Sequence, residues 1–150
     1  MIEIRTTSPD ETLALGRRLA PHLTTGDVLL LSGPLGTGKT CLASGIAEGL
    51  GVGVPLVSPS FLIARTYRDG FLPLVHADVY RLGSLAELDD LELTAEAAEG
   101  VLLVEWGDAV ASGLPQDHLV IRIVRQEAGV RTFRFEPKGT WCERDLGGIL

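Results

Sequence analysis

Two short apolar runs without polar alternation, VLLL at residues 28–31 and VLLV at residues 101–104, are the clearest feature of the hydrophobic pattern. Runs of this kind are typical of strands that are buried on both faces of a parallel sheet. A glycine-rich segment follows the first run, and an acid, Glu105, follows the second. The two runs predict the central strands of one sheet.

Other segments have the composition of more exposed strands. Residues 61–67 and 74–80 are rich in β-branched and aromatic residues, and the turn sequence RDG at residues 68–70 predicts a hairpin between them. Residues 119–124 and 131–135 alternate between apolar and polar positions. We expect this last pair to be antiparallel and to lie at a sheet edge.

Three segments carry helix signals. Ser8 and Glu11 form a capping box that begins the first helix, and we expect this helix to end near residues 25–26. Residues 39–50 have an apolar side chain at every fourth position, which predicts a second helix. Another capping box opens a helical stretch at residues 84–99. Strands and helices therefore alternate along the chain.

The candidate chemistry lies between the first apolar run and the second helix. Residues 33–40 (GPLGTGKT) match the pattern G-x-x-x-x-G-K-[ST], in the strand-to-helix context that this pattern requires. Backbone N–H groups of such a loop surround the β-phosphate of a nucleotide, and the helix N-terminus adds partial positive charge. Lys39 spans the β- and γ-phosphates, and the Thr40 hydroxyl ligates Mg²⁺. The motif predicts binding of a magnesium–nucleotide complex.

This context predicts an α/β fold, a P-loop NTPase-like three-layer sandwich with a mostly parallel central sheet and antiparallel edge hairpins. The chain has 150 residues, of which 45% are hydrophobic and 22% charged, as is ordinary for one globular domain with its own core. We therefore expect residues 1–150 to form a single P-loop ATPase domain.

Charge and cysteine content limit the kinds of binding partner and the cellular compartment that we expect for this protein. Thirteen Lys and Arg against twenty Asp and Glu give a net charge of −7, which disfavours non-specific binding to nucleic acid or to an anionic membrane. We expect no DNA and no membrane partner. The two cysteines, Cys41 and Cys142, have no disulfide or zinc spacing. Charged residues near the N-terminus stand where a signal peptide needs an apolar run, so we expect no such peptide. These features predict a cytoplasmic protein.

Magnesium needs a carboxylate at the end of a neighbouring strand, and two acids qualify. Glu105 follows the strand at residues 101–104, and Asp78 follows residues 74–77. Spacing alone does not rank them. His76 precedes Asp78 by two positions on the same strand face, where it could orient Asp78 or serve a structural role.

Five motifs together carry a resemblance to a known family. They are GTGKT at residues 36–40, SPSF at 58–61, HADVYRL at 76–82, EW at 105–106 and LP at 114–115. In this order, over nearly the whole chain, they resemble the bacterial TsaE (YjeE) family. The resemblance implies a small ATPase that works with the TsaD and TsaB proteins. Its pathway makes threonylcarbamoyladenosine at position 37 of tRNA, so tRNA is reached indirectly, through the complex.

The resemblance also implies roles for individual residues. It assigns phosphate binding to residues Leu35, Gly36, Thr37, Gly38, Lys39 and Thr40. Thr40 and Glu105 hold Mg²⁺, and Asp78 lies near the nucleotide with a catalytic role. Adenine contacts lie near Pro9 and Gly129. Lys39, Asp78 and Glu105 are thus the candidate catalytic residues, with ATP and Mg²⁺ as cofactors.

Three positions depart from the family pattern. Ser60 stands where Thr is commoner, Ser44 where Arg is frequent, and Gly107 where Pro often follows Glu-Trp. The hydroxyl of Ser60 is retained, whereas the other two changes affect expected partner contacts and loop rigidity rather than nucleotide binding.

Three other activities are open to a chain with this loop. A P-loop small-molecule kinase is the main alternative, although no Arg-rich lid segment is evident. A GTPase is disfavoured because no N-K-x-D motif occurs. A binding module that turns ATP over negligibly is the third. No arginine finger is recognisable in the sequence either, which predicts slow hydrolysis by the isolated protein.

Overall fold

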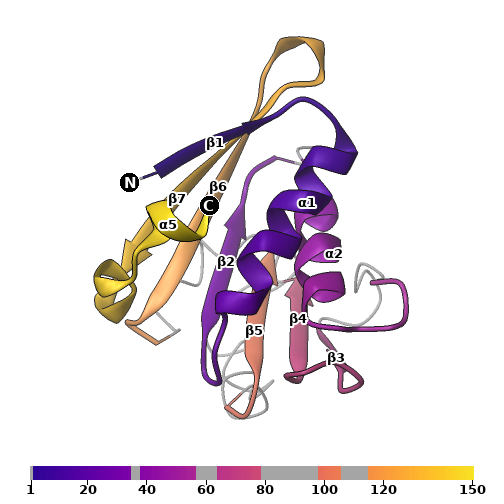
Figure 1. The fold of residues 1–150 in the computed structure, drawn as a ribbon, viewed down its shortest axis with the longest axis vertical. Helices are drawn as coiled ribbons and strands as arrows, with labels where there is room; N and C mark the ends of the chain where they lie inside the picture. The colour runs from indigo at the N-terminus through magenta and orange to yellow at the C-terminus, as the bar shows by residue number, and fades with distance from the viewer. Residues whose placement is uncertain (1, 35–37, 57–63, 79–97, 106–114) are drawn as a thin grey trace.

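The computed structural model describes residues 2–34, 38–56, 64–78, 98–105 and 115–150, which build a seven-stranded sheet (Figure 1). Its spatial order is β1-β7-β6-β2-β5-β4-β3. The strands are β1 (Ile2–Thr6), β2 (Val28–Ser32), β3 (Ala64–Tyr67), β4 (Leu74–Asp78), β5 (Val101–Glu105), β6 (His118–Arg125) and β7 (Arg131–Lys138).

Two longer helices lie side by side against the sheet (Figure 1). They approach closely because glycines face the opposing backbone: a Cβ on Gly16 would lie 2.6 Å from the Ile46 nitrogen, and one on Gly45 would lie 2.4 Å from the Leu13 oxygen. No helix in the described ranges is long and apolar enough to cross a membrane. The helices are α1 (Pro9–Leu19), η1 (Ala20–His22), α2 (Lys39–Gly49), η3 (Glu127–Gly129), η4 (Gly139–Glu143) and α5 (Leu146–Ile149).

Four parallel strands, in the order β6-β2-β5-β4, form the centre of the sheet. Leu29, Leu31 and Leu103 join the core that α1 and α2 cover. Leu30 and Leu102 point to the opposite face and are also fully buried. Burial on both faces confirms the predicted α/β fold with its parallel centre. The helix expected at residues 84–99 falls almost wholly outside the described residues.

The edges of the sheet differ from the prediction. The β6–β7 pair is antiparallel, but β6 also pairs with β2, and β1 pairs with β7 on its outer side. The true edge strand is β1, in which Ile2 and Ile4 alternate with charged residues and pack on the core. At the other edge, β3 and β4 form the predicted antiparallel pair.

The first helix begins as predicted and ends earlier. Ser8 caps α1 by accepting a hydrogen bond from the Glu11 N–H at 3.2 Å. The helix ends at Leu19 rather than near residues 25–26, because Pro21 lacks a backbone N–H and the chain continues as the 3₁₀ turn η1.

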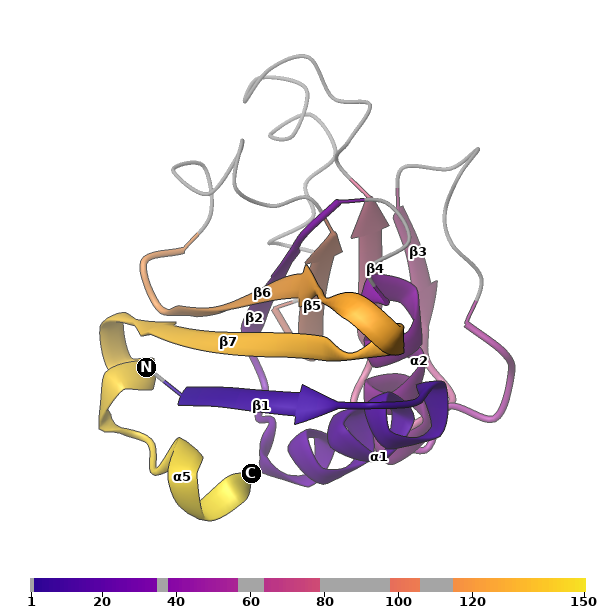
Figure 2. The same ribbon diagram turned by 90° about the horizontal axis from the view of Figure 1, so that it is seen from above.

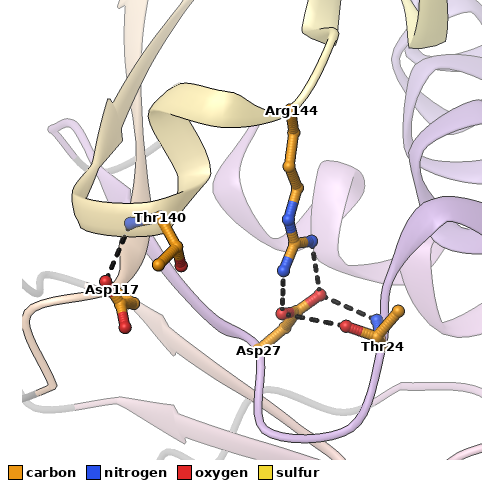
Figure 3. Close-up of polar contacts among 5 residues, drawn as sticks. All are labelled: Thr24, Asp27, Asp117, Thr140 and Arg144. Carbon is orange, nitrogen blue, oxygen red and sulfur yellow. Dashed lines mark hydrogen bonds and ion pairs between the residues drawn. The ribbon is translucent and has the colours of Figure 1, made fainter.

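An ion pair with a buried carboxylate links the C-terminal segment to the start of β2 (Figure 3). Arg144 donates from Nη1 and Nη2 to the two carboxylate oxygens of Asp27, at 2.9 and 2.6 Å. The same carboxylate accepts from the Thr24 backbone N–H at 2.7 Å, and the guanidinium lies 3.7 Å from the centre of the Trp141 ring. Asp27 is only 5% exposed, so this carboxylate depends on its donors.

Arg144→Met is therefore expected to destabilise the fold by about 2–4 kcal/mol, because it leaves a buried carboxylate without its cation. The melting temperature should fall by about 5–10 °C. The matched control is Arg17→Met, since Arg17 pairs with Glu48 on the surface at 2.6 Å with both side chains about half exposed. That change should cost at most about 1 kcal/mol. Equal losses for the two variants in thermal denaturation would contradict the assigned role of Arg144.

Candidate functional site

The first residue of α2 is a buried lysine that turns back over the preceding loop. Gly38, the N-cap of α2, has φ 102°, a left-handed conformation that favours glycine. The Lys39 ammonium donates hydrogen bonds to the backbone carbonyls of Gly33 and Pro34, the latter at 3.3 Å. The lysine of the motif thus lies along the loop, with its charge held by carbonyl oxygens.

Two carboxylates influence this lysine. Burial lowers the pKa of the Lys39 ammonium below its ordinary value, while the nearby charges of Glu105 and Asp78 act in the opposite direction. Residue Lys39 is only 5% exposed. A desolvated cation is well suited to an anionic ligand, since the ligand supplies charge that water no longer provides.

Glu105, at the end of β5, has hydrogen bonds on both of its oxygens. The Thr40 hydroxyl donates to Oε1 at 3.3 Å, and His76 Nε2 lies 2.6 Å from Oε2. The carboxylate only accepts, so Nε2 carries the shared proton. Nδ1 of His76 has no hydrogen-bond partner among the residues that the structure describes. The idea that His76 orients Asp78 is therefore wrong, because its hydrogen bond goes to Glu105.

The register of the sheet explains this contact. Asp78 pairs with Glu105 across β4 and β5, and His76 pairs with Leu103. Alternate residues share a face, so His76, Asp78 and Glu105 all lie on the face that α2 covers. Glu105 contacts both His76 and Thr40, and the charges of Glu105 and Asp78 act on Lys39. This group lies at the carboxyl ends of the parallel strands, where α/β proteins bind ligands.

The donor set suits a hard divalent cation. The Thr40 hydroxyl and the Glu105 carboxylate offer oxygens 3.3 Å apart, and the carboxylate of Asp78 follows one strand away. Mg²⁺ is bound by one or two carboxylates together with water and ligand phosphates, so a small set of protein oxygens suffices. Beside a lysine with a lowered pKa, this arrangement can hold a magnesium–phosphate group.

A second feature is a pocket of about 80 Å³ next to the loop. It brings together Pro9 and Gly129, the two positions named above for adenine contacts, and Gly38 of the phosphate loop. Figure 2 shows how: the loop between β6 and β7 lies beside α2 and the beginning of α1. The lining residues are Ser8, Pro9, Thr12, Gly38, Cys41, Gly129 and Arg131.

Cys41 also lines this pocket and is partly exposed. Its thiol donates to the Pro9 carbonyl at 3.5 Å. Burial raises the pKa of the Cys41 thiol, and the charge of Arg131 opposes that effect. The thiol is thus uncharged at pH 7 and forms part of the pocket wall.

The structure separates the predicted residues into two groups. Lys39, Thr40, Asp78 and Glu105 lie at the strand ends, whereas Pro9, Gly38 and Gly129 line the pocket. The remaining loop positions, Leu35, Gly36 and Thr37, lie outside the described residues, as do Ser60 and Gly107.

Besides Cys41, sequence reasoning missed three lining residues. Ser8 was assigned a role only as a helix cap, and Thr12 and Arg131 were assigned none. No spacing in the sequence joins these positions, because the first turn of α1 and the start of β7 meet only through the fold.

Comparison with known proteins identifies the family of this chain. The family model for threonylcarbamoyl adenosine biosynthesis protein TsaE matches residues 6–133. A protein of that name from Mycobacterium tuberculosis H37Rv is 46% identical over 125 residues, covering 77% of this chain and 74% of its own. The Bacillus subtilis protein is 43% identical over 140 residues, covering 93% and 87%.

A solved structure extends the likeness to the fold. The crystal structure of Bacillus subtilis YdiB superposes with a TM-score of 0.78 at 38% sequence identity, covering 95% of this chain and 91% of that one. The family match spans both the phosphate-loop motif and the strand-end acids. The chain therefore belongs to the TsaE family of threonylcarbamoyl adenosine biosynthesis proteins.

Proposed function

We propose that this protein binds ATP and Mg²⁺, hydrolyses ATP slowly by itself, and acts in the cytoplasm as a nucleotide-dependent partner of a TsaD–TsaB-like complex that modifies adenosine 37 of tRNA. One observation carries the nucleotide part: the contact of Thr40 with Glu105 beside the buried Lys39, at the head of α2, in a chain of the TsaE family. The net charge of −7 favours contact with tRNA through the complex rather than through this chain alone.

Each side chain has a role in this proposal. Lys39 exchanges the carbonyls of Gly33 and Pro34 for the β- and γ-phosphates. Thr40 and Glu105 hold Mg²⁺, which when bound neutralises charge on the phosphates. Asp78, one strand away, positions the attacking water and accepts its hydrogen bond.

The experiment that tests the proposal is a turnover assay with product analysis. We expect slow release of free phosphate from Mg-ATP by the isolated protein, and stimulation of about 10³-fold or more if the complex supplies an arginine finger. A phosphorylated small molecule in place of free phosphate would identify a kinase instead. Full activity of the isolated protein, unchanged by TsaD and TsaB, would contradict the partnership.

His76→Leu is expected to weaken Mg-ADP binding by about 10- to 100-fold, because Glu105 loses the donor that orients its carboxylate. His76→Gln, which retains a donor, should restore part of the loss. Titration calorimetry with magnesium and with EDTA measures both, and the defect should be larger with magnesium. The control is His22→Ala, since His22 is exposed on η1. An equal defect in EDTA would show that His76 acts on the fold rather than on Glu105.

A further inference from the structure

Arg131 carries an unsatisfied donor in a place where one is costly. It begins β7 on the same face as Phe133 and Phe135, which are fully buried in the core, so its side chain is directed toward the helices. Its Nη1 is buried and has no hydrogen-bond partner among the described residues. Folded proteins rarely leave a buried charged donor without an acceptor, so such a donor is a candidate contact for a bound group.

The surroundings of this guanidinium define where that acceptor must lie. Arg131 lines the small pocket with Pro9, Cys41 and Gly129, and its Nε lies 3.8 Å from where a Cβ on Gly38 would stand. The guanidinium thus lies next to Gly38, the last glycine of the phosphate loop, where Arg131 lines the pocket. A ligand that fills the pocket and continues onto the loop passes this donor.

The chemistry of such a ligand follows from the two neighbouring sites. Lys39 and Thr40 face the β- and γ-phosphates in the function proposed above, on which this step rests, and the pocket of Pro9 and Gly129 is the candidate place for the base. The oxygens between them belong to the ribose and the α-phosphate. We infer that Arg131 is a nucleotide-binding residue that donates from Nη1 to an oxygen at this ribose–α-phosphate junction.

This role makes Arg131 a determinant of specificity. It binds the ribose–α-phosphate end of a nucleotide, which inorganic pyrophosphate lacks when it occupies the β- and γ-phosphate positions that Lys39 and Thr40 face. A charge-assisted hydrogen bond to a phosphate oxygen is among the stronger polar contacts. Losing it corresponds to about a 10- to 100-fold change in affinity.

The test compares Arg131→Met with wild type by titration calorimetry against ADP and against inorganic pyrophosphate, both with magnesium. We expect ADP binding to weaken by about 10- to 100-fold and pyrophosphate binding to stay the same. Arg134→Met is the matched control, since Arg134 lies on the same strand and pairs with Glu3 at the surface. It should bind both ligands as wild type does.

The stability of the ligand-free protein separates binding from a structural role. Because Nη1 has no hydrogen-bond partner in the part of the chain that the structure describes, Arg131→Met should melt at the same temperature as wild type or higher. A melting temperature several degrees lower, with pyrophosphate binding lost in parallel, would overturn the inference. Unchanged ADP affinity in Arg131→Met would overturn it as well, while leaving the proposed function intact. If wild type binds neither ligand, the proposed function fails and this inference fails with it.

Cys41 provides an independent readout in the same pocket. In a Cys142→Ser background, which removes the exposed second thiol, Cys41 is the only thiol left to alkylate. ADP should slow its reaction with iodoacetamide, measured at a fixed alkaline pH because its pKa is raised. With Arg131→Met, half-protection should need about 10- to 100-fold more ADP. Equal protection in the two proteins would contradict the inference.

Discussion

Lys39→Met is expected to weaken binding of Mg-ADP and Mg-ATP by about 10²-fold or more, since truncating one partner of a buried charge pair costs on the order of 2–5 kcal/mol. The reason lies in the position of the ammonium. It is largely buried, donates hydrogen bonds to the loop carbonyls of Gly33 and Pro34, and lies near the negative charges of Glu105 and Asp78. Without it, an anionic ligand faces two carboxylates and no lysine.

Calorimetry on wild type, Lys39→Met and Lys138→Met measures this effect. Lys138 is the other lysine of the chain and is exposed at the end of β7, so its removal changes net charge equally without touching the site. We expect Lys138→Met to bind as wild type does. Equal affinity of all three proteins for Mg-ATP would refute the assignment of Lys39 to the phosphates.

The parts of the fold that sequence predicted well are those in which local pattern and tertiary environment agree. The VLLL run became β2, and the apolar positions Leu42, Ile46 and Leu50 of the next helix are buried as expected. Both signals are local: a doubly buried strand has no polar positions, and a helix with one buried face repeats about every four residues.

The edge strands were harder to predict, because whether a strand lies at an edge depends on which other strands pair with it. IEIRT alternates as a strand should, yet its short length and its charges obscured that pattern at the chain start. The pairing of β6 with β2 likewise depends on a contact across the fold, Leu30 with Val120, which alternation within residues 119–124 cannot reveal.

The site residues also divide into those that a local motif locates and those that only tertiary contacts reveal. The loop motif located Lys39 and Thr40, because phosphate binding constrains a continuous stretch of backbone. The partner of His76 was not predictable, since it depends on the parallel register that places Glu105 two residues beyond the position opposite His76. The role of Arg131 could be inferred only from the pocket, which is built from segments more than one hundred residues apart along the chain.

The two acids provide the second large effect, because the structure gives them different neighbours. Glu105 touches Thr40 and His76, whereas Asp78 lies one strand farther and stays half-buried. Glu105→Gln should therefore weaken nucleotide binding more in magnesium than in EDTA, since the lost charge faces the metal. Calorimetry in the two conditions separates a metal effect from a general loss of affinity.

Asp78→Asn should leave Mg-ATP affinity nearly unchanged and lower partner-stimulated turnover by about 10²-fold or more, as expected for a group that takes part in proton transfer. Asparagine keeps the size of the side chain and one acceptor oxygen, but it cannot accept the proton of the attacking water. Single-turnover phosphate release with the partner complex measures the chemical step directly. The two assignments exchange if Asp78→Asn alone abolishes the magnesium dependence of binding, because Asp78 would then be the carboxylate that holds the metal and Glu105 the residue that acts on water.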